Sequence, residues 1–348
     1  MHWGWRVTEQ RNPTIRDVAR EARVGAGTVS RVLSESRHVR PETRQRVLET
    51  VERLGFRPSR MAQGLARGRT QTLGVLVPFF TKHYFLEILR GIEQSAFTHD
   101  YSLIIYNVER REQALAHLEF LRKTRRVDGL IVIALTDRLI TEAYPEMPAF
   151  PVIGVDTRIE GVACLLPDHE KGMYLAVRHL ARLGHKRIAF IDRHQDPVSG
   201  VVSQERQRGH MKACQEAGLS VPDAYQVVTE YSQKGGYHAA RRLLARRQPP
   251  TALACASDLQ AIGAMRAAEE RGLRVGDSVS VTGYHDVELA QYVGLTTVRV
   301  PASDMGAAAV NLLVEMFAGR PPERNVIRFA PRLIVRQSSG PPSSNLPA

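Results

Sequence analysis

From Thr72 onward, short β-branched runs alternate with amphipathic helical segments, and this alternation restricts the possible folds most strongly. Such alternation forms parallel sheets with helices on both faces. About 260 residues of this pattern exceed one ordinary core, and the pattern breaks near Pro167 to His169. We therefore expect an α/β core of two similar parallel-sheet subdomains. Strands are expected at Leu73–Val77, Leu103–Tyr106, Gly129–Ala134, Val152–Val155, Arg187–Ile191, Ala252–Cys255 and Ser278–Thr282.

This type of core predicts the place of a ligand. Ligands of parallel α/β sheets bind at the carboxyl ends of the strands, so two facing subdomains favour the cleft between them. The three cysteines are widely spaced and form no CxxC pair, and the twelve histidines have no metal-ligand spacing. We expect neither a metal nor a cofactor.

Hydropathy argues against membrane insertion and secretion. No apolar run approaches the 18–20 residues, roughly, of a membrane span. The segment from Met1 to Gln10 lacks the apolar region of a secretory signal. We expect a cytoplasmic protein with no membrane partner.

Positive charge is concentrated at the start of the chain. Residues 1–70 hold fifteen arginines and seven acidic residues, a net charge of +8, whereas the whole chain has +12. A basic headpiece on a nearly neutral body is typical of a protein that binds the phosphate backbone of nucleic acid. A solvated arginine-rich surface is the alternative.

The basic region contains signals for three short helices. Thr14 and Asp17 are spaced as a capping box, Pro41 suits a first helical position, and Gly55 suits a C-terminal cap. The break between the first two helices predicts a helix-turn-helix, whose second helix enters the major groove of DNA. That helix runs from Gly27 to Leu33. A helical bundle that binds protein is the alternative.

Several motifs together resemble the lactose-repressor family of bacterial transcription regulators. They are Thr14-Ile-Arg-Asp-Val-Ala-Arg20, Thr28-Val-Ser-Arg-Val-Leu33, Arg40-Pro-Glu-Thr-Arg-Gln-Arg-Val47, Leu54-Gly-Phe-Arg-Pro58, Leu73-Gly-Val-Leu-Val-Pro78, Arg126-Val-Asp-Gly-Leu130, Leu183-Gly-His-Lys-Arg-Ile-Ala-Phe190 and Ser278-Val-Ser-Val-Thr-Gly283. The resemblance extends to about residue 336 and implies a sequence-specific DNA-binding regulator, expected to be a repressor. Its operator affinity would respond to a small molecule, a sugar or sugar derivative, in a core similar to periplasmic sugar-binding proteins.

The resemblance also implies a domain order. It predicts a disordered arm at 1–12, a helix-turn-helix domain at 13–58, a hinge at 59–70, an effector-binding and dimerisation core at 71–336, and a disordered tail at 337–348. Within the core, the N-subdomain is expected at about 71–166 and 300–320, and the C-subdomain at about 167–299 and 321–336. The tail has no heptads, which favours a homodimer over a tetramer.

The family pattern assigns contacts with double-stranded operator DNA. Leu65 matches the hinge leucine that is wedged into the minor groove, where such a wedge kinks the duplex. Arg23 departs from the pattern, because glycine is usual at this corner and a side chain at positive φ costs about 1 kcal/mol. The expected DNA-binding residues are Thr14, Ala26, Gly27, Thr28, Ser30, Arg31, Arg40, Ser59, Ala62 and Leu65.

The pattern assigns effector contacts in the same way. Lys82, His83 and His285 replace neutral or acidic residues that are usual in the family, which points toward an anionic ligand such as a sugar acid or sugar phosphate. The expected effector-binding residues are Phe80, Lys82, Tyr84, Asp156, Arg206, Ser257 and His285.

Three other classes of protein are possible alternatives. An enzyme, such as a sugar-processing α/β protein, is disfavoured because no P-loop, GxSxG or HExxH motif occurs, and because the glycines near Gly25 follow a helix instead of the strand that a dinucleotide loop needs. A solute-binding transport protein is disfavoured by the headpiece and the missing signal. A ligand-independent DNA-binding regulator stays open.

Overall fold

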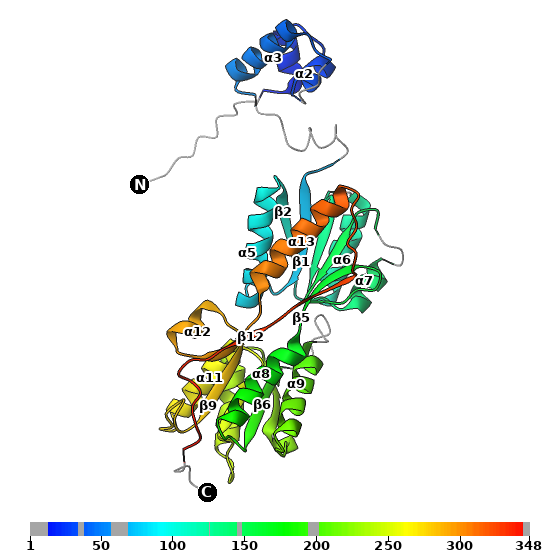
Figure 1. The fold of residues 1–348 in the computed structure, drawn as a ribbon. Helices are drawn as coiled ribbons and strands as arrows, with labels where there is room; N and C mark the ends of the chain where they lie inside the picture. The colour runs from blue at the N-terminus through cyan, green and yellow to red at the C-terminus, as the bar shows by residue number, and fades with distance from the viewer. Residues whose placement is uncertain are drawn as a thin grey trace, which may run out of the picture. The chain divides into compact units, whose positions relative to one another are not determined.

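The structure is a computed structural model that describes residues 13–33, 38–56, 69–124, 126–144, 148–193 and 202–343. It divides into two compact units, residues 1–71 and 72–348. The first unit holds the headpiece and the second holds the core (Figure 1). Ser59, Ala62 and Leu65, the predicted hinge contacts, lie outside the described residues, as does the predicted arm.

The headpiece consists of three helices, α1 (Ile15–Glu21), α2 (Ala26–Leu33) and α3 (Pro41–Leu54). The capping box of Thr14 and Asp17 is present, Pro41 opens α3, and Gly55 ends it in the left-handed conformation. Arg23 also has a positive φ of 52°, which confirms the strain expected at the corner between α1 and α2. The short helices are stabilised by a shared apolar cluster that includes Val18, Val29, Val32 and Val47.

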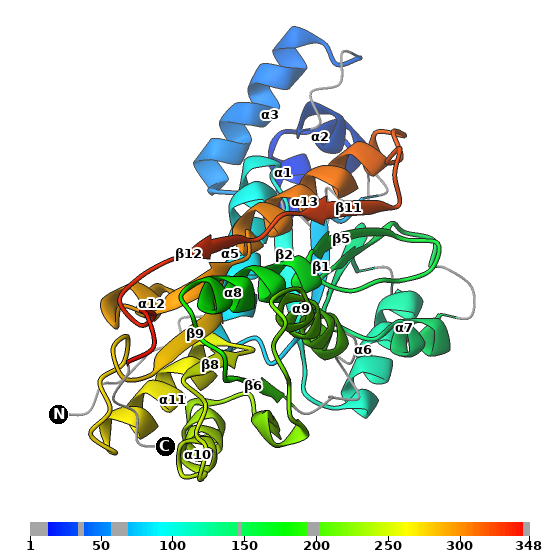
Figure 2. The ribbon, with the colours of Figure 1, turned by 60° about the horizontal axis from the view of Figure 1, so that its bottom comes forward.

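The first core sheet has the strand order β11-β5-β4-β3-β1-β2, and all its pairs are parallel. Helices α5 and α13 contact each other extensively and lie side by side against this sheet (Figures 1 and 2). The elements of this N-subdomain are β1 (Thr72–Pro78), α5 (His83–Thr98), β2 (Ser102–Val108), α6 (Arg111–Thr124), β3 (Gly129–Ile133), α7 (Asp137–Ala143), β4 (Val152–Val155), β5 (Ala163–Pro167), α13 (Ala302–Phe317) and β11 (Val326–Phe329).

The second core sheet has the order β12-β10-β9-β8-β6-β7, and only β12 runs antiparallel among these described strands. The elements of this C-subdomain are α8 (His169–Arg182), β6 (Ile188–Arg193), α9 (Val202–Glu216), the 3₁₀ helix η1 (Asp223–Tyr225), β7 (Gln226–Thr229), α10 (Gln233–Leu244), β8 (Ala252–Cys255), α11 (Asp258–Glu269), β9 (Ser280–His285), α12 (Glu288–Tyr292), β10 (Thr296–Arg299) and β12 (Arg332–Ile334). The expectation of two parallel-sheet subdomains is therefore confirmed.

The chain passes between the two subdomains three times, from β5 to α8, from β10 to α13 and from β11 to β12 (Figure 1). The boundary expected at 321 is wrong, because β11 pairs with β5 in the first sheet before β12 joins the second. β11 is a half-buried edge strand, so its sequence lacks the apolar run by which the central strands were recognised.

Residues 337–343 are ordered, which corrects the expectation that this part of the chain is disordered. Ser338 is buried, its backbone NH donates to the carbonyl of Gly294, and its carbonyl accepts from the NH of Val281. The NH of Gly340 donates to the hydroxyl of Ser280. These bonds attach the segment to the C-subdomain, although its Pro/Ser/Gly-rich composition suggested disorder.

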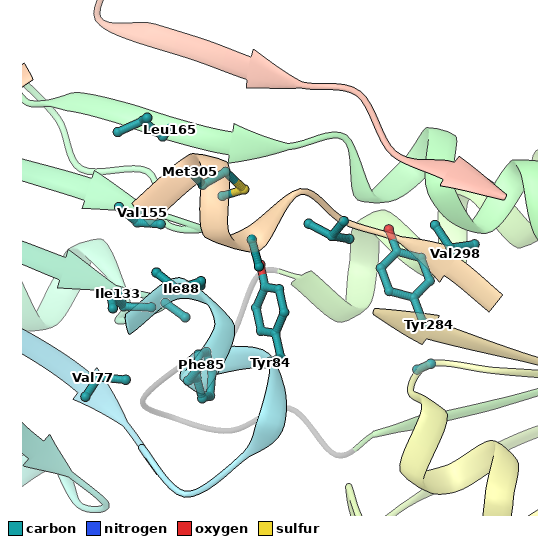
Figure 3. Packing of buried hydrophobic residues seen from close by; sticks show 14 of the residues in the cluster. Val77, Tyr84, Phe85, Ile88, Ile133, Val155, Leu165, Tyr284, Val298 and Met305 are labelled. Carbon is teal, nitrogen blue, oxygen red and sulfur yellow. The ribbon is translucent and has the colours of Figure 1, made fainter. Parts of the chain in front are cut away.

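The N- and C-subdomains share one apolar cluster. It contains strand residues of the first sheet, such as Val77 and Val155, and strand residues of the second, such as Tyr284 and Val298 (Figure 3). Tyr84, near the start of α5, belongs to the same cluster as Tyr284 of β9. The carboxyl ends of the strands of both sheets therefore meet at this junction.

Candidate functional site

Strained backbone is concentrated where strands of both sheets end. Five of the described residues with positive φ, all non-glycine, end or follow β1, β3, β4 and β9; they are Phe79, Ala134, Asp156, His285 and Asp286. Each such residue costs about 1–3 kcal/mol and persists only where surrounding structure holds it, which is common at functional sites. The backbone alone therefore points to the inter-subdomain junction.

Seven side chains meet there and form what we call the cleft cluster. They come from both subdomains and are connected by hydrogen bonds or ring contacts. The members are Tyr84, Asp156, His169, Arg206, Tyr231, Tyr284 and His285.

Asp156 is the centre of one half of the cleft cluster. Its Oδ2 accepts a hydrogen bond from the Tyr84 hydroxyl at 3.0 Å, and its Oδ1 lies 2.7 Å from Nε2 of His169. Nδ1 of His169 lies 3.2 Å from the Tyr284 hydroxyl. Burial, and then the nearby charge of Asp156, raise the pKa of Tyr84 well above its ordinary value. The Tyr84 hydroxyl is therefore protonated and serves as a donor.

His285 is the centre of the other half. Nη2 of Arg206 lies 3.0 Å from Nε2 of His285, and a guanidinium can only donate, so this histidine nitrogen accepts. The Tyr231 hydroxyl lies 3.2 Å from Nδ1 of His285. The Tyr84 ring stacks on the His285 ring with centroids 4.2 Å apart. Because Tyr84 belongs to the N-subdomain and the other three to the C-subdomain, these contacts join the two.

A cavity of about 550 Å³ lies beside the cleft cluster. Most of its lining, including Asp156, comes from the N-subdomain, and His169 and Glu205 line it from the C-subdomain. Of the cleft cluster, only Asp156 and His169 line this cavity. A smaller cavity of about 200 Å³ is lined by Tyr84 and His285, among others. The larger volume is in the range of small-molecule sites.

The cleft cluster contains four of the seven predicted effector residues, Tyr84, Asp156, Arg206 and His285. Lys82 lies close by, with Nζ 5.3 Å from the ring centroid of Tyr231. Two predicted residues have other surroundings: Ser257 caps α11 by accepting from the backbone NH of Gln260, and Phe80 is exposed.

Sequence reasoning missed His169, Tyr231 and Tyr284. The hydroxyl groups of Tyr231 and Tyr284 and the ring of His169 complete the hydrogen bonds of predicted members. The family-like motif that contains Gly283 ends one residue before Tyr284, so that motif was the signal that could have identified it.

The headpiece presents its predicted contacts around the start of α2. Ala26, Gly27 and Arg31 are exposed, and Thr28 and Ser30 are half-buried. Nε of Arg31 donates to the carbonyl of Gly27 at 3.2 Å, so the side chain lies back along the helix.

The first and third helices support this surface. Thr14 caps α1, and exposed Arg40 precedes α3. Nε of Arg46 donates to the carbonyl of Ala22, which ties α3 to the corner. Among the described residues, no helix is long and apolar enough to cross a membrane.

Two family models match the chain in agreement with these units. "Bacterial regulatory proteins, lacI family" matches residues 14–59, and "Periplasmic binding protein-like domain" matches residues 177–339. A helix-turn-helix headpiece joined to such a core defines the class of DNA-binding transcription regulators.

Relatives of known function extend the match to nearly the whole chain. Catabolite control protein A of Priestia megaterium is 34% identical over 335 residues, which cover 94% of this chain and 99% of the relative. The HTH-type transcriptional repressor PurR of Salmonella paratyphi B is 34% identical over 332 residues, 93% of this chain and 96% of PurR. The chain belongs to the lacI family of bacterial regulatory proteins, and it is a DNA-binding transcriptional repressor of that family and not an enzyme.

Solved structures agree with this assignment. The lac repressor dimer bound to operator and the anti-inducer ONPF has a TM-score of 0.85 at 28% identity, covering 95% of this chain and 100% of that one. A complex of the transcriptional regulator CelR with cellobiose has a TM-score of 0.69 at 28% identity, covering 94% of this chain and 99% of that one. A family member from Enterococcus faecium with bound ribose has a TM-score of 0.68 at 28% identity, covering 78% of this chain and 99% of that one.

Proposed function

We propose that this repressor binds its operator as a homodimer and that a small molecule, a sugar or sugar derivative, bound between the core subdomains modulates its affinity for DNA. The observation that carries the proposal is the cleft cluster, in which polar side chains of both subdomains are buried together beside a cavity of about 550 Å³. A ligand that contacts both subdomains binds one arrangement of them more tightly than another. This difference in affinity couples the ligand site to the DNA-binding site.

Several features support the sugar assignment. Aromatic faces of Tyr84, Tyr231 and Tyr284 can pack against a sugar ring, while Asp156 and Arg206 can contact its oxygens. The similar structures named above include complexes with cellobiose and with ribose.

A homodimer is supported by apolar side chains that the single chain leaves exposed. Phe97 of α5 is 80% exposed and Tyr292 of α12 is 74% exposed, and Ile105 lies on the edge strand β2. Exposed apolar groups of this kind mark protein interfaces when they gather. Two chains would place two headpieces on a pseudo-palindromic site.

DNA recognition is assigned to the residues at the start of α2, together with Leu65 of the hinge as a minor-groove wedge. Ala26 and Gly27 have little or no side chain, so base readout depends on Arg31 and on DNA shape. Thr14, Thr28, Ser30, Arg40, Ser59 and Ala62 are assigned to phosphate or groove contacts.

The test is a gel-retardation assay with the full chain and duplex fragments from its own promoter region at low salt, with and without sugars. We expect salt-sensitive retardation that a sugar or sugar derivative alters. Replacing Arg31 by Ala is expected to weaken binding by about 1–3 kcal/mol, whereas Arg53→Ala is the matched control, since Arg53 pairs with Glu21 on the headpiece surface. Absence of retardation of every fragment, or retardation that no small molecule alters, would contradict the DNA-binding or the effector part, respectively.

A further inference from the structure

The guanidinium of Arg206 is buried, and one of its nitrogens lacks a hydrogen-bond partner among the described residues. Arg206 is only 2% exposed and is among the largest fully buried side chains of the described residues. Nη2 donates to His285, and the guanidinium carbon lies 4.3 Å from the ring centroid of Tyr284. Nε has no hydrogen-bond partner among the described residues.

Such an arrangement is costly without a further partner. A buried donor that makes no hydrogen bond loses its bond to water without a replacement, which destabilises the folded state. Nε–H and a neighbouring Nη–H form the planar fork that binds a carboxylate through two parallel hydrogen bonds. The unpartnered Nε therefore indicates the kind of group that a ligand must bring.

The main acceptors of the cleft cluster already have partners within the protein. Both oxygens of Asp156 have partners, in Tyr84 and His169, and Nε2 of His285 accepts from Arg206. Lys82 adds a second cation, with Nζ 4.5 Å from the ring centroid of Phe79. The unmet demand is thus for acceptor oxygens.

The charge on the ligand is limited by two nearby acids. Asp156 and Asp192 are close enough to Arg206 to interact with its charge. They repel an added dianion more than a monoanion, so a carboxylate fits better than a phosphate dianion. The aromatic faces around Arg206 favour a ring that carries this carboxylate.

We propose that the effector is a sugar acid and that its carboxylate binds the Nε side of the Arg206 guanidinium. This inference rests on the proposed function, because it assigns a ligand class to the same cleft. If it is correct, the cleft prefers a sugar acid to the matching neutral sugar, because a neutral sugar offers Nε of Arg206 no acceptor as strong as a carboxylate.

The experiment compares matched ligands by calorimetry and thermal shift on the full chain. The pairs are glucuronate with glucose and galacturonate with galactose, and glucose 6-phosphate is the dianionic probe. We expect at least one acid to bind more tightly than its neutral partner and than the phosphate. Loss of a charge-assisted contact in Arg206→Gln is expected to weaken acid binding by about ten- to a hundredfold.

Two further variants keep the test decisive. Arg208→Gln is the matched control, because Arg208 lies on the same helix, is exposed and pairs with Glu170; it is expected to bind the acids normally. Arg206→Lys keeps the charge but loses the planar pair of N–H donors. It replaces the glutamine variant in the test if that variant does not fold. It is expected to bind the acids more weakly than the unchanged chain does.

Neutral sugars that bind as tightly as their acids, or acids that bind equally well after either change at Arg206, would overturn the inference and leave the proposed function intact. The same holds if only glucose 6-phosphate binds, or if none of the probes binds while another small molecule alters DNA retardation. Retardation that no small molecule alters would overturn the proposed effector function as well.

Discussion

Acidification should destabilise the core through His210, a residue of α9 that is fully buried. Its ring stacks on Phe190 with centroids 5.1 Å apart, Nε2 lies 3.8 Å from Sγ of Cys214, and Nδ1 has no partner among the described residues. Burial lowers the pKa of His210 from 6.5 to about 4. The folded chain therefore holds this ring in its neutral form, whereas the unfolded chain protonates it more readily.

The direction and size of the effect follow from this difference. A depressed pKa in the folded state contributes stability that is present above pH 6.5 and is lost as the pH falls toward 4. Because one pKa unit is worth about 1.4 kcal/mol, the loss at pH 5 is about 2 kcal/mol relative to pH 7.5. For a core of this size, that corresponds to a drop of roughly 4–8 °C in melting temperature.

The measurement compares the unchanged chain with His210→Phe by thermal and urea unfolding between pH 7.5 and 5. The phenylalanine ring preserves the stack and removes the titrating nitrogen. Burial also lowers the pKa of His185, and burial raises the pKa of Asp258 to about 7, a shift that adds stability as the pH falls through 7. These contributions are common to both proteins, so the difference between the two pH profiles isolates His210.

The variant should lose about 2 kcal/mol less stability between pH 7.5 and 5 than the unchanged chain does. His238→Gln is the control, because His238 is exposed on α10, and its profile should match that of the unchanged chain. Parallel profiles for the unchanged chain and His210→Phe would refute the argument from burial.

Other predictions concern packing and helix ends. A Cβ on Gly91 would lie 1.9 Å from the carbonyl oxygen of Ser303, where α5 meets α13. Gly91→Ala should therefore lower the free energy of unfolding of the core in urea by about 2–3 kcal/mol. Gly27→Ala is the control, because a Cβ there meets open space, and it should leave the core transition unchanged. Arg23→Gly should relieve the left-handed strain at φ 52° and stabilise the headpiece by about 0.5–1 kcal/mol, seen as slower amide exchange in α1 and α2; faster exchange would contradict it. Thr14→Ala should remove the capping box of α1 and lower the stability of this helix by about 1 kcal/mol, which faster amide exchange in α1 would show. Unchanged amide exchange would show that the cap contributes nothing.

Several central strands of both sheets could be predicted because they are continuous apolar runs, whereas the interior strands β5 and β10 were missed. β1, β3, β4 and β8 are buried along nearly their whole length, as parallel strands between helices must be. The edge strands β7 and β11 escaped prediction because they are only partly buried. They lack a run of apolar residues, so they form strands because a neighbouring strand pairs with their backbone, and their own composition does not indicate this.

The site could be predicted only in part, for a related reason. Asp156 directly follows an apolar strand, and that position indicates a carboxyl end. Ser257, by contrast, directly precedes α11 and uses its hydroxyl as the cap, a role that serine favours on local grounds. His169 and Tyr284 are separated by 115 positions along the chain, and no local pattern indicates that they meet.

The order of amino acids alone determined the features that depend on near neighbours: the helix caps, the apolar strands and the concentration of arginine in the headpiece. These follow from sterics, hydrogen bonding and charge over a few residues. Only the tertiary structure decided that β11 returns to the first sheet and that Arg206 is buried with an unpartnered nitrogen. Both outcomes depend on how distant segments share one interior, because solvent exclusion and the supply of hydrogen-bond partners are properties of the packed fold.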